Sequence, residues 1–357
     1  MIAAGPGFVE AEPANDMTNL TYYDRFPLER RDPVAYPVPS FGEVMTAIYY
    51  FSPHAYSRPS GGVATHYEHV RGLRRAGLEA FILHDRADYA PDWLSVDVPV
   101  RSLEAGNMSG SGPGPGDVVV LPEDFPAALR AFAEAPFRRV VFCQNQYYAA
   151  AVLNDIGDWR RFGVDGVVAS SEMVRDFLAL AGWPDAPLIP YAIDTARFAP
   201  ADKIERIACM PRKMGLEAAA IAYLFRRRFP ELAQVPLVTL DGLHHHRVAA
   251  ELARSSVFLA LGRNESFGLP PLEAMACGAL VAGFHGDGDL GRPAARDAAL
   301  WVDGIAGAVD ALGTLIGWLR EGDERAHIQR RRAEALLAGY SAQARDQALL
   351  AYWRSPP

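Results

Sequence analysis

Residues Gly262–Gly278, GRNESFGLPPLEAMACG, are the stretch from which the fold is best inferred. The run before it, SVFLAL, is apolar and has the length of a buried strand. Pro270 and Pro271 indicate a helix start, because proline fits the first helical turn, where the amide has no intrahelical partner. Gly278 is a suitable residue just after the helix. The stretch therefore predicts a strand, a tight loop and a short helix.

Two glutamates lie in this stretch, Glu265 in the loop and Glu273 in or near the first turn of the helix. Between them, the amides of Phe267, Gly268 and Leu269 lie near the helix N-terminus, where free N–H groups and the macrodipole attract anions. Carboxylates on both sides of an anion site suit a ligand with hydroxyls at each end and phosphate in the middle, such as a nucleotide-sugar. The alternative is a solvated loop glutamate beside a glutamate favoured by the helix dipole.

The composition predicts two domains and no membrane span. The chain has 357 residues, more than the roughly 250–300 at which a single hydrophobic core stops growing. No run approaches the roughly 20 apolar residues that cross a bilayer. The N-terminus is acidic and rich in proline, unlike a signal peptide, and the three cysteines are far apart in apolar contexts. These features predict a cytoplasmic protein with reduced cysteines.

The net charge of −8 is unevenly distributed. Residues 1–195 contain 15 arginines and no lysine against 25 acidic residues, a net charge of −10, and the remainder carries +2. Neither half is strongly basic, so we expect no nucleic-acid partner, and there is no strong membrane signal. The sequence leaves the oligomeric state open, a homo-oligomer included.

Strand and helix patterns alternate along the chain after a proline-rich segment. Residues 1–43 show no sustained periodicity and predict an extended arm. Beyond them, apolar runs of strand length alternate with helical patterns, which predicts parallel sheets covered by helices in doubly wound α/β domains. We expect one domain over residues 44–195, a second over 196–340, and a final helix within 341–357.

Candidate binding residues follow several of the predicted strands. Gly61 and Gly62 lie in the loop before a helix expected from Val63 to Arg75, although a plain turn explains the pair equally well. Gln144 and Asn145 follow a later strand, at the end where an α/β domain places its binding groups.

Arg212 and Lys213 form a basic loop between a strand and a long helix in the second half. Lys213 is one of two lysines in a chain that otherwise uses arginine. This second strand, loop and helix unit repeats the organisation of the first half and offers positive charge to a ligand.

Two patterns that resemble metal sites are better explained without a metal. Asp287 and Asp289 form a D-x-D in a glycine-rich loop, but no neighbouring residue in the sequence supports them as ligands. His244, His245 and His246 are consecutive and do not converge on one metal in regular structure, so we interpret them as exposed loop histidines. We predict neither a metal nor a cofactor.

The complete pattern resembles the retaining glycosyltransferases of the GT-B fold, family 4, over roughly residues 44–353. The segment ESFGLPPLEAMACG is similar to the family's E-x-F-G-x-x-x-x-E-A-M-A-x-G signature. The segment VVASSEMVRDFL…LIPYAIDTARFAP resembles the family's passage into its second domain, with Tyr191-Ala192 in place of the usual Asn-Gly. The resemblance implies an α/β protein of two Rossmann-like doubly wound domains facing across a cleft, with a C-terminal helix that returns to the first domain.

The resemblance also implies roles for the donor-side residues. Glu273 is expected to bind the ribose hydroxyls of the nucleotide-sugar, and Glu265 to contact the donor sugar near its reacting end. Arg212 and Lys213 are expected to hold the diphosphate, and with Glu265 they form the predicted catalytic set. The loop residues expected to complete the donor site are Ser266, Phe267, Gly268 and Leu269.

On the other side, the resemblance implies that Gly61 and Gly62 let the first domain approach the donor. Gln144 and Asn145 stand where the family usually has a histidine, and we expect them to contact the acceptor or the sugar. The function implied is a retaining, metal-independent transfer from a nucleotide-diphosphate sugar to a hydroxyl of a saccharide, lipid-linked or natural-product acceptor.

Two other functions are weighed against this one. A catalytically silent homologue that binds nucleotide-sugar or a partner enzyme remains an alternative, because the strand-end histidine is absent. An NAD-dependent oxidoreductase is disfavoured, because no G-x-G-x-x-G opens a helix after a strand.

Overall fold

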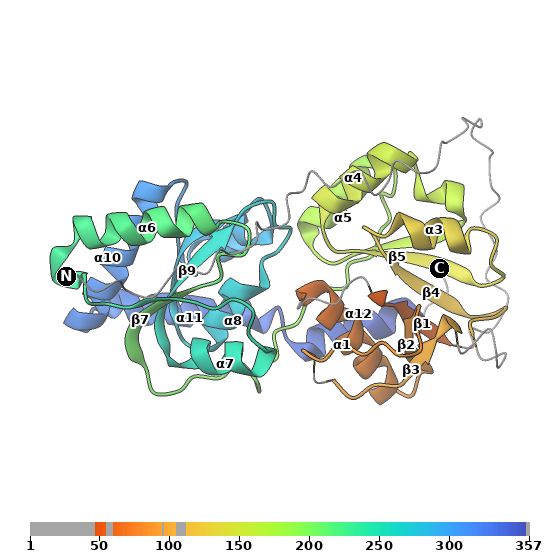
Figure 1. Ribbon diagram of the computed structural model, residues 1–357, viewed down its shortest axis with the longest axis horizontal. Coiled ribbons are helices and arrows are strands. Elements are labelled where there is room, and N and C mark those ends of the chain that lie inside the picture. Colours follow the sequence, from red (N-terminus) through yellow and green to blue (C-terminus); the bar gives the residue numbers. More distant parts are fainter. Residues whose placement is uncertain (1–46, 55–59, 95, 105–111, 355–357) are drawn as a thin grey trace, which may run out of the picture. The chain divides into compact units, whose positions relative to one another are not determined.

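The computed structural model describes residues 47–54, 60–94, 96–104 and 112–354 (Figure 1). The predicted arm over residues 1–43 lies outside the described residues. Both sheets of the protein belong to one compact unit within Pro39–Pro357. No helix among the described residues is long and apolar enough to cross a bilayer.

The first sheet has six parallel strands in the order β3-β2-β1-β4-β5-β6. Its central strands are apolar and buried on both faces, as parallel sheets covered by helices require. The strands are β1 Ile48–Phe51, β2 Ala80–His84, β3 Val100–Ser102, β4 Val118–Pro122, β5 Arg138–Cys143 and β6 Val164–Ala169. The helices are α1 Gly61–Arg75, α3 Pro126–Phe132, α4 Gln146–Ile156 and α5 Glu172–Leu180.

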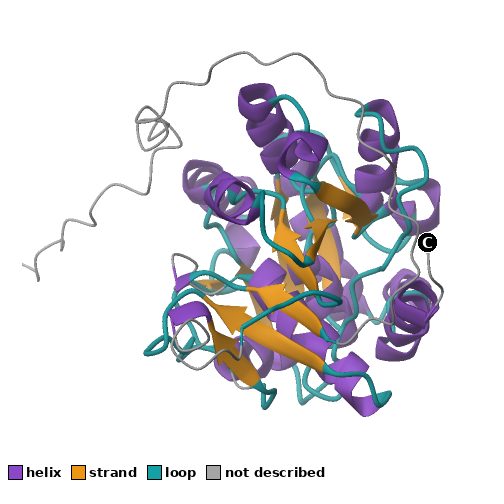
Figure 2. Cartoon of the chain, turned by 90° about the vertical axis from the view of Figure 1, so that its right-hand side faces the viewer, coloured by secondary structure: helices purple, strands orange, loops and turns teal. Residues whose placement is uncertain are grey.

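The second sheet has five parallel strands in the order β11-β10-β9-β7-β8. Its strands are β7 Ile204–Cys209, β8 Leu237–Thr239, β9 Ser255–Gly262, β10 Leu280–His285 and β11 Leu300–Trp301. Its helices are α6 Gly215–Arg228, α7 His245–Arg254, α8 Leu269–Ala276, α9 Pro293–Arg296, α10 Ile305–Glu321 and α11 Glu324–Ala338. Figure 2 shows helices on both sides of the strands.

The strand order decides which loops lie together. In the second sheet, β7 pairs with both β8 and β9, so the strand order reverses direction beside β7. Ligands of open α/β sheets bind at the carboxyl ends of the strands near such a switch point. The loop after β7 carries Arg212 and Lys213, and the loop after β9 carries Glu265, so strand pairing brings these residues to one edge.

The final helix, α12 Ala342–Arg354, packs on the first sheet although it follows the second in sequence (Figure 1). Its Leu349 and Trp353 belong to the same hydrophobic cluster as Ile48 and Tyr50 of β1. The boundaries that we predict between residues 195 and 196 and at residue 341 stay predictions.

Candidate functional site

The loop between β9 and α8 has the backbone geometry that its sequence predicts. Gly268 occupies the position before α8 with φ of +81°, a left-handed conformation that favours glycine. Helix α8 begins at Leu269, and Pro270 and Pro271 have no amide hydrogen to donate. An anion at this helix start therefore depends on the amides up to Leu269. Ser266 and Phe267 are buried at the base of the loop.

Lys213 and Glu265 form an ion pair, with Nζ and Oε1 separated by 2.7 Å. Burial lowers the pKa of Lys213, but the Glu265 carboxylate and Tyr148 together raise it by more, so the pKa lies above its usual range. The Lys213 Nζ also lies 5.4 Å from the centroid of the Tyr148 ring. Lys213 is thus a charged group held beside the glycine loop, and Arg212 is exposed next to it.

Glu273 is a buried carboxylate on α8, and its side chain is 11% exposed. Its Oε1 lies 3.6 Å from His245 Nε2, and His245 Nδ1 lies 2.9 Å from Arg197 Nη1. His245 and His246 are the first two residues of α7, so the prediction of loop histidines is wrong for both. His244 and His246 are exposed as predicted, whereas His245 is partly buried. Sequence spacing missed His245 because only the packing of α7 against α8 brings it to Glu273.

Gly61 and Gly62 begin α1 rather than lying in the preceding loop, so the helix starts two residues before the predicted Val63. A methyl carbon placed on Gly61 would lie 2.6 Å from Leu269 Cδ1 at the start of α8. On Gly62 it would lie 3.2 Å from the side-chain nitrogen of Gln144. Glycine at these positions therefore allows the start of α1 to approach both α8 and the end of β5.

Gln144 uses its side-chain amide within the protein. Its Nε2 lies 3.3 Å from both the Gly62 carbonyl oxygen and His66 Nε2, and its Oε1 accepts a hydrogen bond of 3.3 Å from the Tyr191 hydroxyl. Burial lowers the pKa of His66 to about 4, so its neutral ring can accept from the amide. The sequence gives no signal for His66, whereas Tyr191 is visible as a departure from the Asn-Gly pattern.

Asn145 caps helix α4. Its Oδ1 accepts hydrogen bonds from the amides of Tyr147, at 2.9 Å, and Tyr148, at 3.4 Å, which satisfies the helix start. Its Nδ2 donates to the Asn264 carbonyl oxygen at 3.4 Å. Asn145 therefore connects the end of β5 to the loop that carries Glu265.

The two aspartates of the D-x-D pattern have separate protein partners. Asp287 accepts a hydrogen bond of 2.7 Å from the Tyr147 hydroxyl. Asp289 is buried and accepts from the amides of Glu172, at 3.0 Å, and Met173, at 2.8 Å, at the start of α5. Among the residues that the structure describes, no group of three or more His, Cys, Asp or Glu side chains is arranged to hold a metal ion.

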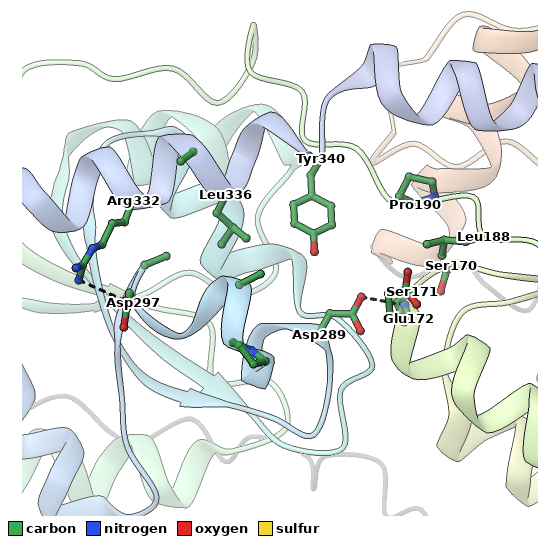
Figure 3. A pocket seen from close by; sticks show the side chains of 15 residues that line it. Ser170, Ser171, Glu172, Leu188, Pro190, Asp289, Asp297, Arg332, Leu336 and Tyr340 are labelled. Carbon is green, nitrogen blue, oxygen red and sulfur yellow. Dashed lines mark hydrogen bonds and ion pairs between the residues drawn. The ribbon is translucent and has the colours of Figure 1, made fainter.

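A cavity of about 600 Å³ lies beside this Asp289 contact (Figure 3). Figure 3 shows Asp289 reaching the start of α5, with Tyr340, Leu336 and Arg332 on the opposite side. None of the predicted donor or catalytic residues lines this cavity. We therefore place the candidate site at the loop of Glu265 and at Lys213 and Glu273, where the charged groups gather.

No protein-family model matches the sequence. An alpha-1,6-glucosyltransferase of Actinobacillus pleuropneumoniae serotype 7 (strain AP76) is 26% identical over 249 residues, which are 66% of this chain and 72% of that protein.

Solved structures show the same fold at low sequence identity. A glycosyltransferase from Rickettsia africae ESF-5 has a TM-score of 0.60 at 15% identity, over 88% of this chain and 98% of that one. HepE of Anabaena in complex with UDP-glucose has a TM-score of 0.63 at 12% identity, over 87% of this chain and 100% of that one. The predicted α/β fold with two Rossmann-like parallel sheets, the GT-B fold, is confirmed.

Proposed function

We propose that this protein is a retaining glycosyltransferase that moves a sugar from a nucleoside diphosphate, with UDP-glucose as the first donor to test. The observation that carries the proposal is the juxtaposition of Lys213, Glu265 and the start of α8 at the carboxyl edge of the second sheet. The names of the similar proteins support it, because they include a glucosyltransferase and a protein bound to UDP-glucose.

The chemistry of the reaction fits these groups. Transfer breaks the bond between the anomeric carbon of the sugar and a phosphate oxygen, so positive charge grows on the sugar and negative charge on the departing diphosphate. Lys213, Arg212 and the amides before α8 supply positive charge for the diphosphate, and stabilising developing charge is often the largest catalytic contribution. Glu265 supplies a carboxylate for the sugar, and Glu273 accepts hydrogen bonds from ribose hydroxyls.

Binding of the diphosphate changes the state of the Lys213–Glu265 ion pair. Without donor, the lysine charge is neutralised by Glu265 at 2.7 Å. When phosphate oxygens approach, Lys213 is shared between them and Glu265, and the carboxylate is released towards the sugar. We propose that the reaction needs no divalent metal, because Lys213, Arg212 and the helix start neutralise the phosphates.

The acceptor in this proposal is a hydroxyl of a saccharide, a lipid-linked intermediate or a natural product. A catalytically silent homologue remains the second candidate, and one observation favours it. The Gln144 amide, which stands where the family has a histidine, is occupied by Gly62, His66 and Tyr191. An amide engaged in this way contributes little to an acceptor hydroxyl.

The proposal is tested by donor turnover. The purified protein is incubated with UDP-glucose in the presence and absence of EDTA, with a panel of saccharide acceptors, and released UDP is measured. We expect transfer or slow donor hydrolysis that EDTA does not abolish, and an α-linked product by NMR. Inversion at the anomeric carbon would overturn the retaining mechanism. Binding of UDP-glucose without any turnover would favour the silent homologue.

A further inference from the structure

A chain of polar side chains connects Glu273 to the segment before the second sheet. Arg197 Nη2 lies 3.8 Å from Asp194 Oδ2, and its Nη1 lies 2.9 Å from His245 Nδ1. The other ring nitrogen of His245, Nε2, lies 3.6 Å from Glu273 Oε1. The ring is packed edge-on against Phe198, with centroids 5.5 Å apart. Arg197, Glu273 and Phe198 therefore orient the His245 ring from three sides.

The arginine fixes which nitrogen of His245 carries the proton. A guanidinium only donates hydrogen bonds, so Nδ1 at 2.9 Å from Arg197 must accept. The neutral ring then carries its proton on Nε2, which is the atom beside the Glu273 carboxylate. This tautomer directs an N–H of His245 towards Glu273, at an N···O distance of 3.6 Å, without requiring a charged imidazole.

We propose that His245 is a positioning residue for Glu273, holding one carboxylate oxygen so that the other is presented to the ribose hydroxyls of the donor. The inference rests on the proposed function, because it assumes that Glu273 binds ribose. The Glu273 carboxylate can rotate about its side-chain bonds. An N–H group of His245 that is held by neighbouring side chains favours one orientation of this carboxylate before the nucleotide binds.

Open space beside this arrangement leaves room for a ligand. Arg197 and His245 line a cavity of about 340 Å³, together with Asp92, Trp93, His244 and His246. His245 lines this cavity and also lies beside the Glu273 carboxylate, so it borders both the carboxylate and the open space.

The experiment measures binding of UDP and of 2′,3′-dideoxy-UDP by titration calorimetry. Histidine 245 is replaced in His245→Ala and in His245→Gln, whose amide can donate to Glu273 in place of Nε2. His327→Ala, an exposed histidine on α11, is the matched control. We expect His245→Ala to weaken UDP binding roughly 10-fold, because Glu273 loses the polar neighbour that orients its carboxylate before UDP binds. Binding of the dideoxy analogue should change less than about 2-fold, because it has no hydroxyls for Glu273 to bind.

The two variants and the analogue separate positioning from packing. His245→Gln should recover most of the UDP affinity, and His327→Ala should leave both ligands unaffected. Equal weakening of UDP and its dideoxy analogue in His245→Ala, or unchanged UDP affinity, would overturn the inference.

Glu273→Gln tests the proposed function separately. If this variant binds UDP as tightly as the wild type, the ribose-binding role of Glu273 fails, whatever His245 does. If Glu273→Gln weakens UDP selectively but His245→Ala does not, the proposed function stands and the positioning role of His245 falls. If the wild type binds neither ligand, the uridine donor and the inference fall together.

Discussion

The Lys213 ammonium lies 2.7 Å from the Glu265 carboxylate, and the two residues come from the loops that follow the paired strands β7 and β9. This pair places opposite charges where the proposed reaction needs one for the diphosphate and one for the sugar. In the structure, each charge is compensated by the other.

Glu265→Gln should separate donor binding from turnover. The variant removes the carboxylate that neutralises Lys213, so the lysine is available to phosphate and UDP should bind as tightly as in the wild type or more tightly. Turnover should fall roughly 100-fold, because a charge acting on the reacting sugar is lost. Calorimetry with UDP and release of UDP from UDP-glucose measure the two quantities. A parallel loss of UDP affinity would show that Glu265 serves the nucleotide instead.

Gly61→Val should reduce turnover more than it reduces stability. A methyl carbon placed on Gly61 would lie 2.6 Å from Leu269 Cδ1, so the larger valine forces Leu269 to move and fills the space beside the start of α8. Gly215→Val is the matched control, because Gly215 also begins a helix and has open space around it. We expect at least a roughly 10-fold lower kcat/KM only for the Gly61 variant, corresponding to about 1.4 kcal/mol in the barrier. Equal effects in both variants would refute the role of the contact.

Asp289→Ala should destabilise the folded protein. The buried Asp289 carboxylate accepts two amides at the start of α5, and loss of a side-chain cap costs about 1–2 kcal/mol. Asp297→Ala, which removes an exposed carboxylate 3.8 Å from Arg332, should change stability by less than about 0.5 kcal/mol. Urea unfolding of the two variants gives the comparison. A change of similar size in both would mean that Asp289 does not act as a cap.

His66 should make the folded state sensitive to mild acid. Burial lowers its pKa from 6.5 to about 4, so between these values the unfolded chain binds a proton that the native state does not. The free energy of unfolding should therefore fall as the pH drops from 6.5 to 4, by up to about 3 kcal/mol from this residue. His66→Gln should show a shallower decrease over the same window in urea unfolding. An unchanged slope would show that other groups, such as the buried His69 with its lowered pKa, account for the loss.

The sequence predicted the parts of the site that depend on local geometry. Pro270 and Pro271 located the start of α8, and the glycine at 268 matched the left-handed φ that the turn needs. The sequence predicts the start of α1 two residues too late, because consecutive glycines such as Gly61 and Gly62 are typical of loops. Glycine has a low helix propensity. At positions 61 and 62 it leaves room for Leu269 and Gln144, which only the tertiary structure brings near.

The sequence does not predict which residues surround the side-chain amides of Gln144 and Asn145. Gln144 is expected to meet a sugar hydroxyl, yet its side-chain amide contacts Gly62 and His66, both on α1, and Tyr191 from the segment before the second sheet. The role of Gln144 and Asn145 towards an acceptor stays a prediction. Their partners within the protein explain why side chains of these types stand at the end of β5.

By itself, the sequence determined the parallel α/β architecture and the loop from Glu265 to Leu269. Apolar runs of strand length, helical spacing and proline and glycine positions are set by backbone sterics and burial, which act over a few residues. Only the tertiary structure decided that Lys213 neutralises Glu265 and that His245 meets Glu273. These contacts depend on which strands pair and which helices pack together. Strand pairing and helix packing are set by the burial of apolar faces from the whole chain, so a local sequence pattern does not predict them.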